Sequence, residues 1–481
     1  MHMFRGSAWA ILMRWCIRLI GLVSTIILSR VLHPADFGLL AMGTLMIGLL
    51  TALSRFGEGQ LLMRERNVTR EHCDTAWTIR LVKSLVIGVI LASAAPLAVR
   101  YFREPRALQV FYVLGTVVAI SGLQNIGMVL VTRELDFARD FRFNVYSKLV
   151  RFSTTVPLAF VLRNYWALLL GYLINAILDV VMTYWMHAYR PRLSLAKLKE
   201  YLRFSVSMIP LNFGAFLAGK IDTFVVGRIG ETSQLGSYNV AAELSVMATD
   251  ELGMQVSRAL FPSYAKLLEQ PRELAEAFVH SLGAMAVISF ALGVGLAAVA
   301  KEFVLAVLGT KWEMAIPFLQ WLAICGAIRS VSQILSGSIL IVTGHERMSA
   351  MLIWFRLALA APAALIAGHW WGIAGVPIAV TVASALVLPF AVFAVTRAIP
   401  VTYRDIVRAL WRPLLAAVVM TLAVRTYSAV TSSALLDLSV RVGLGALVFL
   451  STLLILWVVT GKGAGPERAM ISLVEKRFTR T

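Results

Sequence analysis

The sequence predicts an all-α protein that crosses a membrane many times. Apolar runs of about twenty residues recur from one end of the 481-residue chain to the other. The composition is 59% hydrophobic and only 15% charged, with a mean hydropathy of +0.78. A hydrocarbon layer of ~30 Å requires helices of this length, whereas a soluble core needs no such runs. Soluble enzymes, disulfide-stabilised secreted domains, disordered chains and β-barrels are therefore excluded.

About fourteen membrane-spanning helices are expected, one for each apolar run. The runs lie near 7–29, 37–54, 76–99, 107–132, 147–162, 165–187, 204–227, 235–257, 277–300, 314–343, 348–367, 371–396, 413–429 and 440–460. At about 21 residues each they leave about a dozen residues per connection, too few for a catalytic domain. The first run follows residues 1–6 directly, so no separate cleavable signal peptide is expected.

Basic residues in the connections predict the orientation. If both termini are cytoplasmic, the inside segments hold 27 Lys and Arg and the outside segments hold ten. This bias favours an even number of spans with both ends inside a bacterial inner membrane. Although the net charge is +19, the cations are scattered among short connections, and no nucleic-acid partner is expected.

Two of the inside segments are amphipathic. Leucines alternate with basic residues over 190–203, and apolar and basic residues mix again over 466–480. Both patterns are typical of interfacial helices that lie on an anionic leaflet and bind membrane lipids, and a solvated basic loop is the alternative for each.

An internal repeat divides the chain into two lobes. RVLHPADFGLL begins at Arg30 and RIGETSQLGSY begins at Arg228, with Gly38 and Gly236 at matching positions 198 residues apart. Six spans fit within this offset, so the two copies enter the membrane in the same direction, as pseudo-symmetric six-helix lobes. The expected domains are an N-lobe over 1–187, a linker over 188–203, a C-lobe over 204–396, two further spans over 397–460 and a tail over 461–481.

Cations inside the predicted spans are the candidate binding residues. A charge at a helix centre costs about 2.5–3.5 kcal/mol if it faces lipid, so these side chains must face water, a partner or the interface. Their excess over the acids in the spans predicts a cationic cavity for an anion, and Arg suits phosphate because its guanidinium donates two parallel hydrogen bonds. The predicted cavity residues are Arg14, Arg18, Arg80, Lys83, Arg329 and Arg356.

Two alternatives remain open for these cations. Arg80 and Lys83 lie within about two turns of a predicted span end, where long side chains reach the interface. The others could pair with acids in the spans, for example Arg18 with Asp179.

Three acids are candidates for ion or proton coupling: Asp222, Asp179 and Asp250. For Asp222 a structural hydrogen bond to neighbouring backbone is the alternative. The three cysteines and seven histidines are scattered, with no CxxC or HExxH, so no disulfide framework, metal site or cofactor is expected.

Several stretches in a fixed order resemble one transporter family. They are ILSRVLHPADFGLLAM, LLMRERNVTREHCDTAW, VTRELDFARDF, YWALLLGYL, LNFGAFLAGKIDTFVVGRIGETSQLGSYNVAAEL, RALFPSYAKL and LGTKWEMAIPFLQWL, over about residues 20–345. The chain resembles the polysaccharide transporter branch of the multidrug/oligosaccharidyl-lipid/polysaccharide (MOP) superfamily, the Wzx-type flippases.

The resemblance implies a MATE-like fold and a flippase for undecaprenyl-diphosphate-linked oligosaccharides of exopolysaccharide, O-antigen or capsule pathways, working by alternating access. It also implies a polysaccharide polymerase and a chain-length regulator as partners. Another exporter of the superfamily, a lipid II flippase or a multidrug antiporter, is the alternative, although an antiporter should have an acidic cavity. A membrane enzyme would need a large periplasmic loop or a nucleotide-sugar site, and the sequence has neither.

Overall fold

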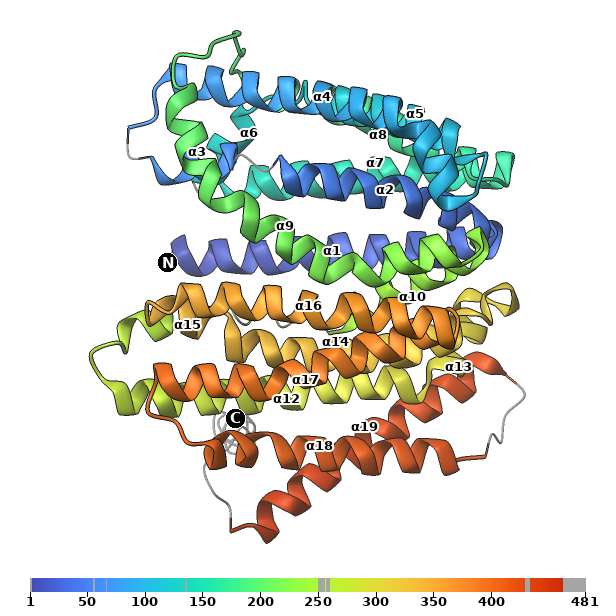
Figure 1. The fold of residues 1–481 in the computed structure, drawn as a ribbon, viewed down its shortest axis with the longest axis vertical. Helices are drawn as coiled ribbons and strands as arrows, with labels where there is room; N and C mark the ends of the chain where they lie inside the picture. Colours follow the sequence, from blue (N-terminus) through green and yellow to red (C-terminus); the bar gives the residue numbers. More distant parts are fainter. Residues whose placement is uncertain are drawn as a thin grey trace. The chain divides into compact units, whose positions relative to one another are not determined.

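The computed structural model describes the backbone of residues 2–54, 57–65, 67–134, 136–249, 256, 260–428 and 433–461, and their side chains except those of 2–15, 137, 204 and 206–208. By its internal contacts the chain divides into two compact units, Met1–Gly236 and Ser237–Thr481. Within the described ranges every regular element is a helix (Figure 1). The expected all-α architecture is therefore confirmed.

The first unit contains long helices that run side by side, with short helices at their ends (Figure 1). Its elements are α1 (His2–Val31), α2 (Pro34–Leu53), α3 (Glu58–Arg64), α4 (Arg70–Phe102), α5 (Ala107–Ser121), α6 (Gly127–Arg133), α7 (Phe137–Leu162), α8 (Trp166–Met186), α9 (Leu198–Ile229) and the first turn of α10 (Thr232–Ala248). Helix α9 belongs to this unit because it packs on α2 and α4. The domain boundaries expected from the repeat stay a prediction.

The second unit is built around a core that α12, α14, α17 and α18 share. Its elements are the rest of α10, α12 (Pro271–Ala298), α13 (Ala300–Phe303), the π-helix Val304–Leu308, the 3-10 helix Thr310–Trp312, α14 (Ala315–Ser336), α15 (Ser338–Val342), α16 (Glu346–Trp370), α17 (Gly375–Ala398), α18 (Tyr403–Thr426) and α19 (Ala434–Val459). Large apolar side chains such as Phe278 and Leu335 are fully buried in this core.

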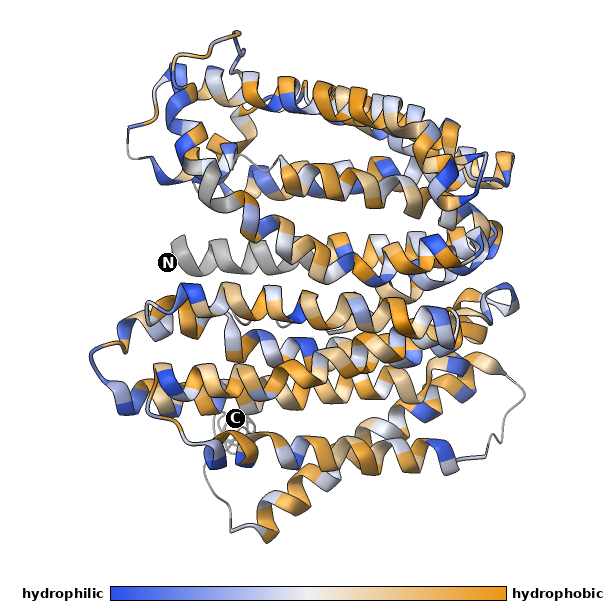
Figure 2. Cartoon of the chain, in the orientation of Figure 1, coloured by the Kyte–Doolittle hydropathy of each residue, from blue (hydrophilic) through white to orange (hydrophobic). Residues whose placement is uncertain are grey.

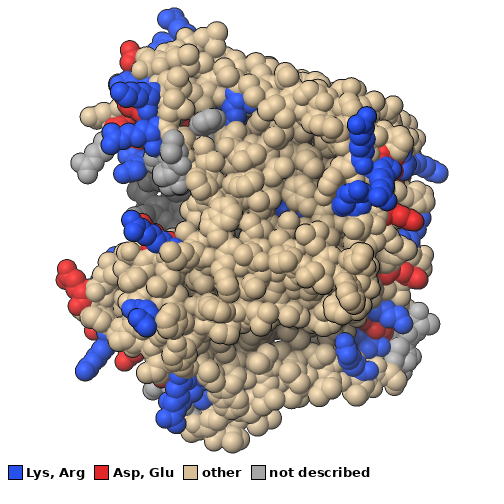
Figure 3. All heavy atoms as spheres, in the orientation of Figure 1, with Lys and Arg blue, Asp and Glu red and all other residues tan. Residues whose placement is uncertain are grey.

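The outward faces of the helices suit hydrocarbon. Val161, Leu97 and Ile455 are 79%, 65% and 61% exposed, and Figure 2 shows apolar residues along most of each helix. Lys and Arg gather near the helix ends instead (Figure 3). Ten described helices are long and apolar enough to cross a membrane. Because contiguous apolar surface is costly in water, these faces indicate a lipid environment.

Helices lie over all fourteen expected runs, although the number of crossings stays a prediction. Two runs expected to be continuous are broken. The run 107–132 divides into α5 and α6, and the run 314–343 divides at Gly337 into α14 and α15. The apolar periodicity extends across both breaks, so the sequence pattern gives no sign of them.

Asn125 explains the first break. Its side chain accepts from the Gly127 amide at 2.9 Å, which satisfies a donor at the start of α6. The Asn125 amide group donates to the Tyr189 carbonyl at 2.6 Å, and its backbone N–H donates to Thr183 Oγ1 at 3.1 Å. One buried Asn therefore supplies partners that the interrupted helix would lack.

The prediction of an interfacial helix over 190–203 is wrong for most of that segment. Residues 187–195 are extended, and α9 begins only at Leu198. Pro191 has no N–H to donate, and the nearby N–H groups bond to side chains of α4 instead of to each other. The predicted tail helix over 466–480 lies outside the described residues.

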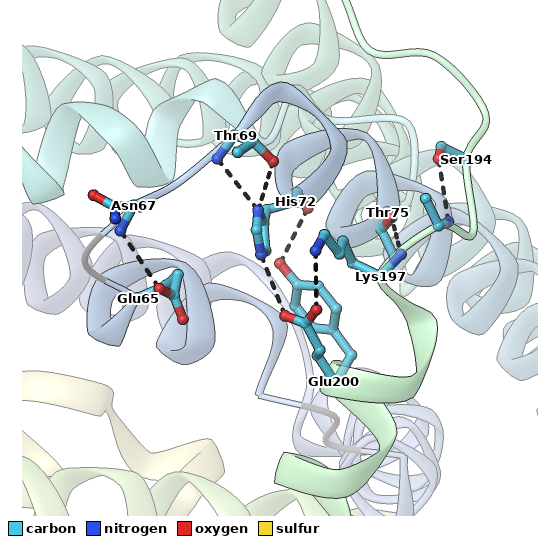
Figure 4. Close-up of polar contacts among 10 residues, drawn as sticks. Glu65, Asn67, Thr69, His72, Thr75, Ser194, Lys197 and Glu200 are labelled. Atoms are coloured by element: carbon cyan, nitrogen blue, oxygen red, sulfur yellow. Dashed lines mark hydrogen bonds and ion pairs between the residues drawn. The ribbon is translucent and has the colours of Figure 1, made fainter.

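Hydrogen bonds hold the extended segment against α4. The Arg192 N–H donates to Asp74 Oδ1 at 2.8 Å, and the Tyr189 hydroxyl donates to the same oxygen. Further along, the Ser194 N–H donates to Thr78 Oγ1 at 3.0 Å (Figure 4). Because Asp74 is buried, these bonds supply the partners its carboxylate needs.

His72 adds hydrogen bonds between the first turn of α4 and the start of α9. Its Nδ1 accepts from the Thr69 N–H at 3.2 Å, which assigns the proton to Nε2. Nε2 then donates to Glu200 Oε2 at 3.3 Å, and the Tyr201 hydroxyl donates to the His72 carbonyl at 3.1 Å (Figure 4). Glu200 also accepts from Lys197, which holds the pKa of its carboxyl below the usual value.

The two repeat glycines meet within the first unit. A Cβ on Gly38 would overlap the carbonyl oxygen of Thr232, and a Cβ on Gly236 would overlap the carbonyl oxygen of Pro34. Pro34 and Thr232 are themselves 198 residues apart, so the contact is reciprocal, as between copies related by a local two-fold axis. The first turns of α2 and α10 therefore approach backbone to backbone at the two glycines that the repeat aligns.

Gly38→Ala should destabilise the protein because the added methyl group meets a backbone atom that no rotamer change can move. We expect a loss of about 1–3 kcal/mol or more. Gly219→Ala is the matched control, because no atom lies within 4 Å of that position on α9. Melting temperatures of the purified variants in detergent, followed by size-exclusion fluorescence, should show a loss for Gly38→Ala only. Equal melting temperatures would refute the close contact.

Asp74→Ala should release the 187–195 segment. The substitution removes the acceptor of two bonds to a charged group, each worth about 1.5–3 kcal/mol. Trypsin should then cleave after Arg192 at least about tenfold faster, because local opening precedes cleavage. The control is Glu71→Ala, an exposed position on the same turn of α4. If both variants are cut at the wild-type rate, Asp74 does not hold the segment.

Candidate functional site

The predicted cavity residues on α4 have partners in the first unit. Lys83 forms an ion pair with Glu58 of α3, and both side chains are largely buried. Arg80 donates to the Gln124 amide oxygen at the break between α5 and α6. Glu58 also lies within electrostatic reach of Arg80. The structure therefore brings Arg80 and Lys83 together, with one carboxylate beside them.

Arg18 lies on α1 and is half-buried. Helix α1 packs against α7, and one turn beyond Arg18 a Cβ on Gly21 would lie 3.5 Å from Lys148 Cε. A second cation of α7, Arg151, lies 4.6 Å from the centre of the Tyr172 ring on α8. The α1–α7–α8 packing therefore contains several cations. The side chain of Arg14, one turn earlier on α1, is outside the described part.

Arg329 and Arg356 lie deep in helices of the second unit. Arg329 is seven residues from the end of α14 and Arg356 is ten from the start of α16, so their nearest helix ends are about 10 Å and 15 Å away along the helix axes. Both side chains are half-buried, and the Nε atom of each is shielded from solvent. Two cations at these depths are expensive in hydrocarbon. A single site formed by all six predicted cations stays a prediction.

The candidate coupling acids occupy different surroundings. Asp222 on α9 is buried, and its Oδ1 accepts from the Thr223 N–H at 2.7 Å. Asp179 on α8 accepts from the Asn175 amide group at 2.8 Å and lies near Ser147 and Arg151 of α7. Asp250 lies outside the described residues. The predicted hydrogen bond of Asp222 to neighbouring backbone is present, and its coupling role stays a prediction.

Three arginines that the sequence places among the basic residues of the inside connections lie close together in the structure. Arg70, Arg133 and Arg190 line a pocket of about 650 Å³, together with Thr69, Glu134 and Tyr189. Its walls are the N-terminus of α4, the C-terminus of α6 and the extended segment after α8. The three arginines are 57 to 120 residues apart along the chain, so their proximity leaves no local pattern in the sequence.

Tyr189 keeps one wall of this pocket in place. Burial of the phenol and the neighbouring Asp74 carboxylate raise the pKa of Tyr189, so its hydroxyl stays protonated and donates to Asp74 throughout the physiological range. At the adjoining end of α8, burial and the nearby Arg139 lower the pKa of His187. A neutral His187 then accepts from the Tyr189 N–H at 3.1 Å through Nδ1.

Comparisons with known proteins agree with this architecture. A family model described as "Polysaccharide biosynthesis protein" matches residues 27–317. The lipopolysaccharide biosynthesis protein WzxC of Escherichia coli (strain K12) is 27% identical over 419 residues, which cover 85% of this chain and 84% of that protein. The succinoglycan biosynthesis transport protein ExoT of Rhizobium meliloti (strain 1021) is 23% identical, covering 67% of this chain and 66% of that protein.

Among solved structures, the lipid II flippase MurJ in an inward closed conformation has the same fold. Its TM-score is 0.77 at 12% identity, and the match covers 94% of this chain and 99% of that one. This likeness concerns the fold, and the sequence match over 27–317, more than half of the chain, concerns the family. The chain belongs to the polysaccharide biosynthesis protein family, which confirms the resemblance drawn from its sequence.

Proposed function

We propose that the chain is a flippase for lipid-linked oligosaccharides. It moves undecaprenyl-diphosphate-linked repeat units from the cytoplasmic to the periplasmic leaflet of a bacterial inner membrane, for assembly of an exopolysaccharide, O-antigen or capsule. The match of the polysaccharide biosynthesis family to residues 27–317, on a fold shared with a flippase, carries this proposal. Relatives with a stated activity are transport proteins, so the prediction that the chain is a transporter and not an enzyme is confirmed.

The physical task is to move a charged diphosphate and hydrophilic sugars across hydrocarbon. Neither group crosses unaided, because a buried charge without partners is costly by several kcal/mol or more. A cleft that opens to each leaflet in turn, lined by cations, replaces the water around the headgroup while the isoprenoid tail stays in lipid. The lining residues in this proposal are Arg14, Arg18, Arg80, Lys83, Arg329 and Arg356.

The positions and partners of these cations indicate which of them are the better candidates to bind the diphosphate. Lys83 already has the Glu58 carboxylate as a partner, and Arg80 lies beside the same acid, so one carboxylate offsets part of the charge of these two cations. Arg18, Arg329 and Arg356 lie deeper in their predicted spans and are the better candidates to hold the diphosphate. Both termini are cytoplasmic in this proposal, and a polysaccharide polymerase and a chain-length regulator receive the units on the periplasmic side.

Arg18→Ala, Arg329→Ala and Arg356→Ala should each impair export without loss of membrane insertion. One charge-assisted contact is worth about 1.5–3 kcal/mol, so each variant should slow export about tenfold or more. The test is complementation of a strain that lacks the chain, with surface polymer and accumulated lipid-linked units measured together. Lysine at each position should restore part of the activity, because it keeps the charge but not the bidentate geometry.

Arg404→Ala, at an exposed position in the first turn of α18, is the matched control and should export normally. Unchanged export in the three single variants and in the triple variant would refute the cationic cavity. Loss of peptidoglycan precursor transport, with surface polymer intact, would instead identify a lipid II flippase.

We further propose that Asp222 and Asp179, and Asp250 beyond the described residues, couple transport to an ion or proton gradient. Inverted membrane vesicles should translocate the glycolipid faster when a pH gradient is imposed, and nigericin should abolish the difference. Asp222→Asn should remove this stimulation, because an amide cannot exchange the proton. The control is Glu231→Gln, an exposed position just after α9. Wild-type stimulation of Asp222→Asn would exclude Asp222 from coupling.

A further inference from the structure

We propose that the pocket lined by Arg70, Arg133 and Arg190 binds a phosphate group. It belongs entirely to the first unit, and none of its residues is among the predicted cavity cations. The ligand chemistry is that of a phosphate ester, which an anionic phospholipid headgroup or a soluble phosphate compound can both supply. The proposal does not depend on the transport reaction, because binding can be measured without transport.

The first argument is convergence of positive charge. Three arginines line the pocket from three separate segments. Glu134 is the one acid among its lining residues, and Asp74 beside the pocket pairs with Arg70 at 3.7 Å. Arg133 donates to the Glu65 carbonyl at 2.7 Å, and Arg190 donates through Nη1 to the His187 and Tyr189 carbonyls at 2.8 Å and 3.0 Å. These bonds orient the side chains. A guanidinium has five N–H donors, so Arg190 can donate to an anion as well.

The second argument is that the pocket is formed in advance. The Asn125 side chain holds the Tyr189 carbonyl at 2.6 Å, and Asp74 accepts from the Tyr189 hydroxyl and from the Arg192 N–H. The wall that carries Arg190 is therefore fixed on both sides of Tyr189. A preformed site loses less conformational entropy when a ligand binds than a mobile loop does.

The third argument concerns helix α4, whose N-terminus forms one wall of the pocket. Helix α4 is 33 residues long, and the residue before its first turn, Thr69, lines the pocket. The positive end of the helix dipole therefore adds to the charge of the arginines. The volume of about 650 Å³ lies within the usual range for small-molecule sites and equals roughly twenty waters. It admits an ester group beside the phosphate, and the apolar Val68 and Leu130 on the lining suit such a group.

The test measures binding to the purified full-length protein. Native mass spectrometry with phosphatidylglycerol tests the lipid source, with phosphatidylcholine as the neutral lipid. Thermal stabilisation by pyrophosphate tests the soluble source. Arg133→Gln and, as a second variant, Arg190→Gln should each weaken binding at least about tenfold. Arg133→Lys should restore part of it.

The matched control is Arg142→Gln, an exposed arginine of α7 that donates to the Ala138 carbonyl at 3.3 Å and does not line the pocket. Because the Arg190 side chain is exposed and donates to carbonyls of its own segment, its variant keeps the test valid if Arg133→Gln fails to fold. Selective loss of phosphatidylglycerol binding supports a lipid headgroup, and selective loss of pyrophosphate binding supports a soluble ligand. No binding, or equal binding by Arg142→Gln and both pocket variants, would overturn the proposal.

Discussion

The absence of water inside a bilayer is the constraint on which the rest of this structure depends. Each helix must satisfy its own backbone, and each charged side chain must find a partner, a route to the interface or an aqueous cavity. Lys83 illustrates the first solution for a charge, because it reaches Glu58 on a neighbouring helix. Arg329 and Arg356 lie about two turns or more from either end of their helices, where a charge that faces hydrocarbon is costly.

Much of the fold could be predicted because membrane helices depend mainly on local sequence. An apolar run of sufficient length forms a helix whatever its neighbours are, so the expected runs coincide with helices. The repeat was also readable, since Gly38 and Gly236 keep their spacing for a steric reason. The break at Asn125 and the extended 187–195 segment were not predictable, because both depend on partners distant in the chain: Thr183 and Tyr189 for the first, Asp74 and Thr78 for the second.

The candidate sites, like the fold, could be predicted from the sequence only in part. Individual cations in apolar runs are visible in the sequence, but their partners are not. Glu58 precedes Lys83 by 25 residues, and nothing in that spacing indicates an ion pair. The pocket of Arg70, Arg133 and Arg190 was hidden more completely, because a count of loop charges assigns all three to membrane orientation. Positive residues at helix ends can serve both purposes, and only their convergence in space separates an orientation signal from a binding site.

The reciprocal glycine contact between α2 and α10 limits how the protein can evolve. The atoms that face Gly38 and Gly236 include carbonyl oxygens, which every amino acid carries. Trimming the opposing side chain therefore cannot compensate for a larger residue at either glycine. Genetic suppressors of such a change must instead shift one helix along or away from the other, and an insertion between Pro34 and Gly38 would turn the small face of α2 away from its partner by about 100°.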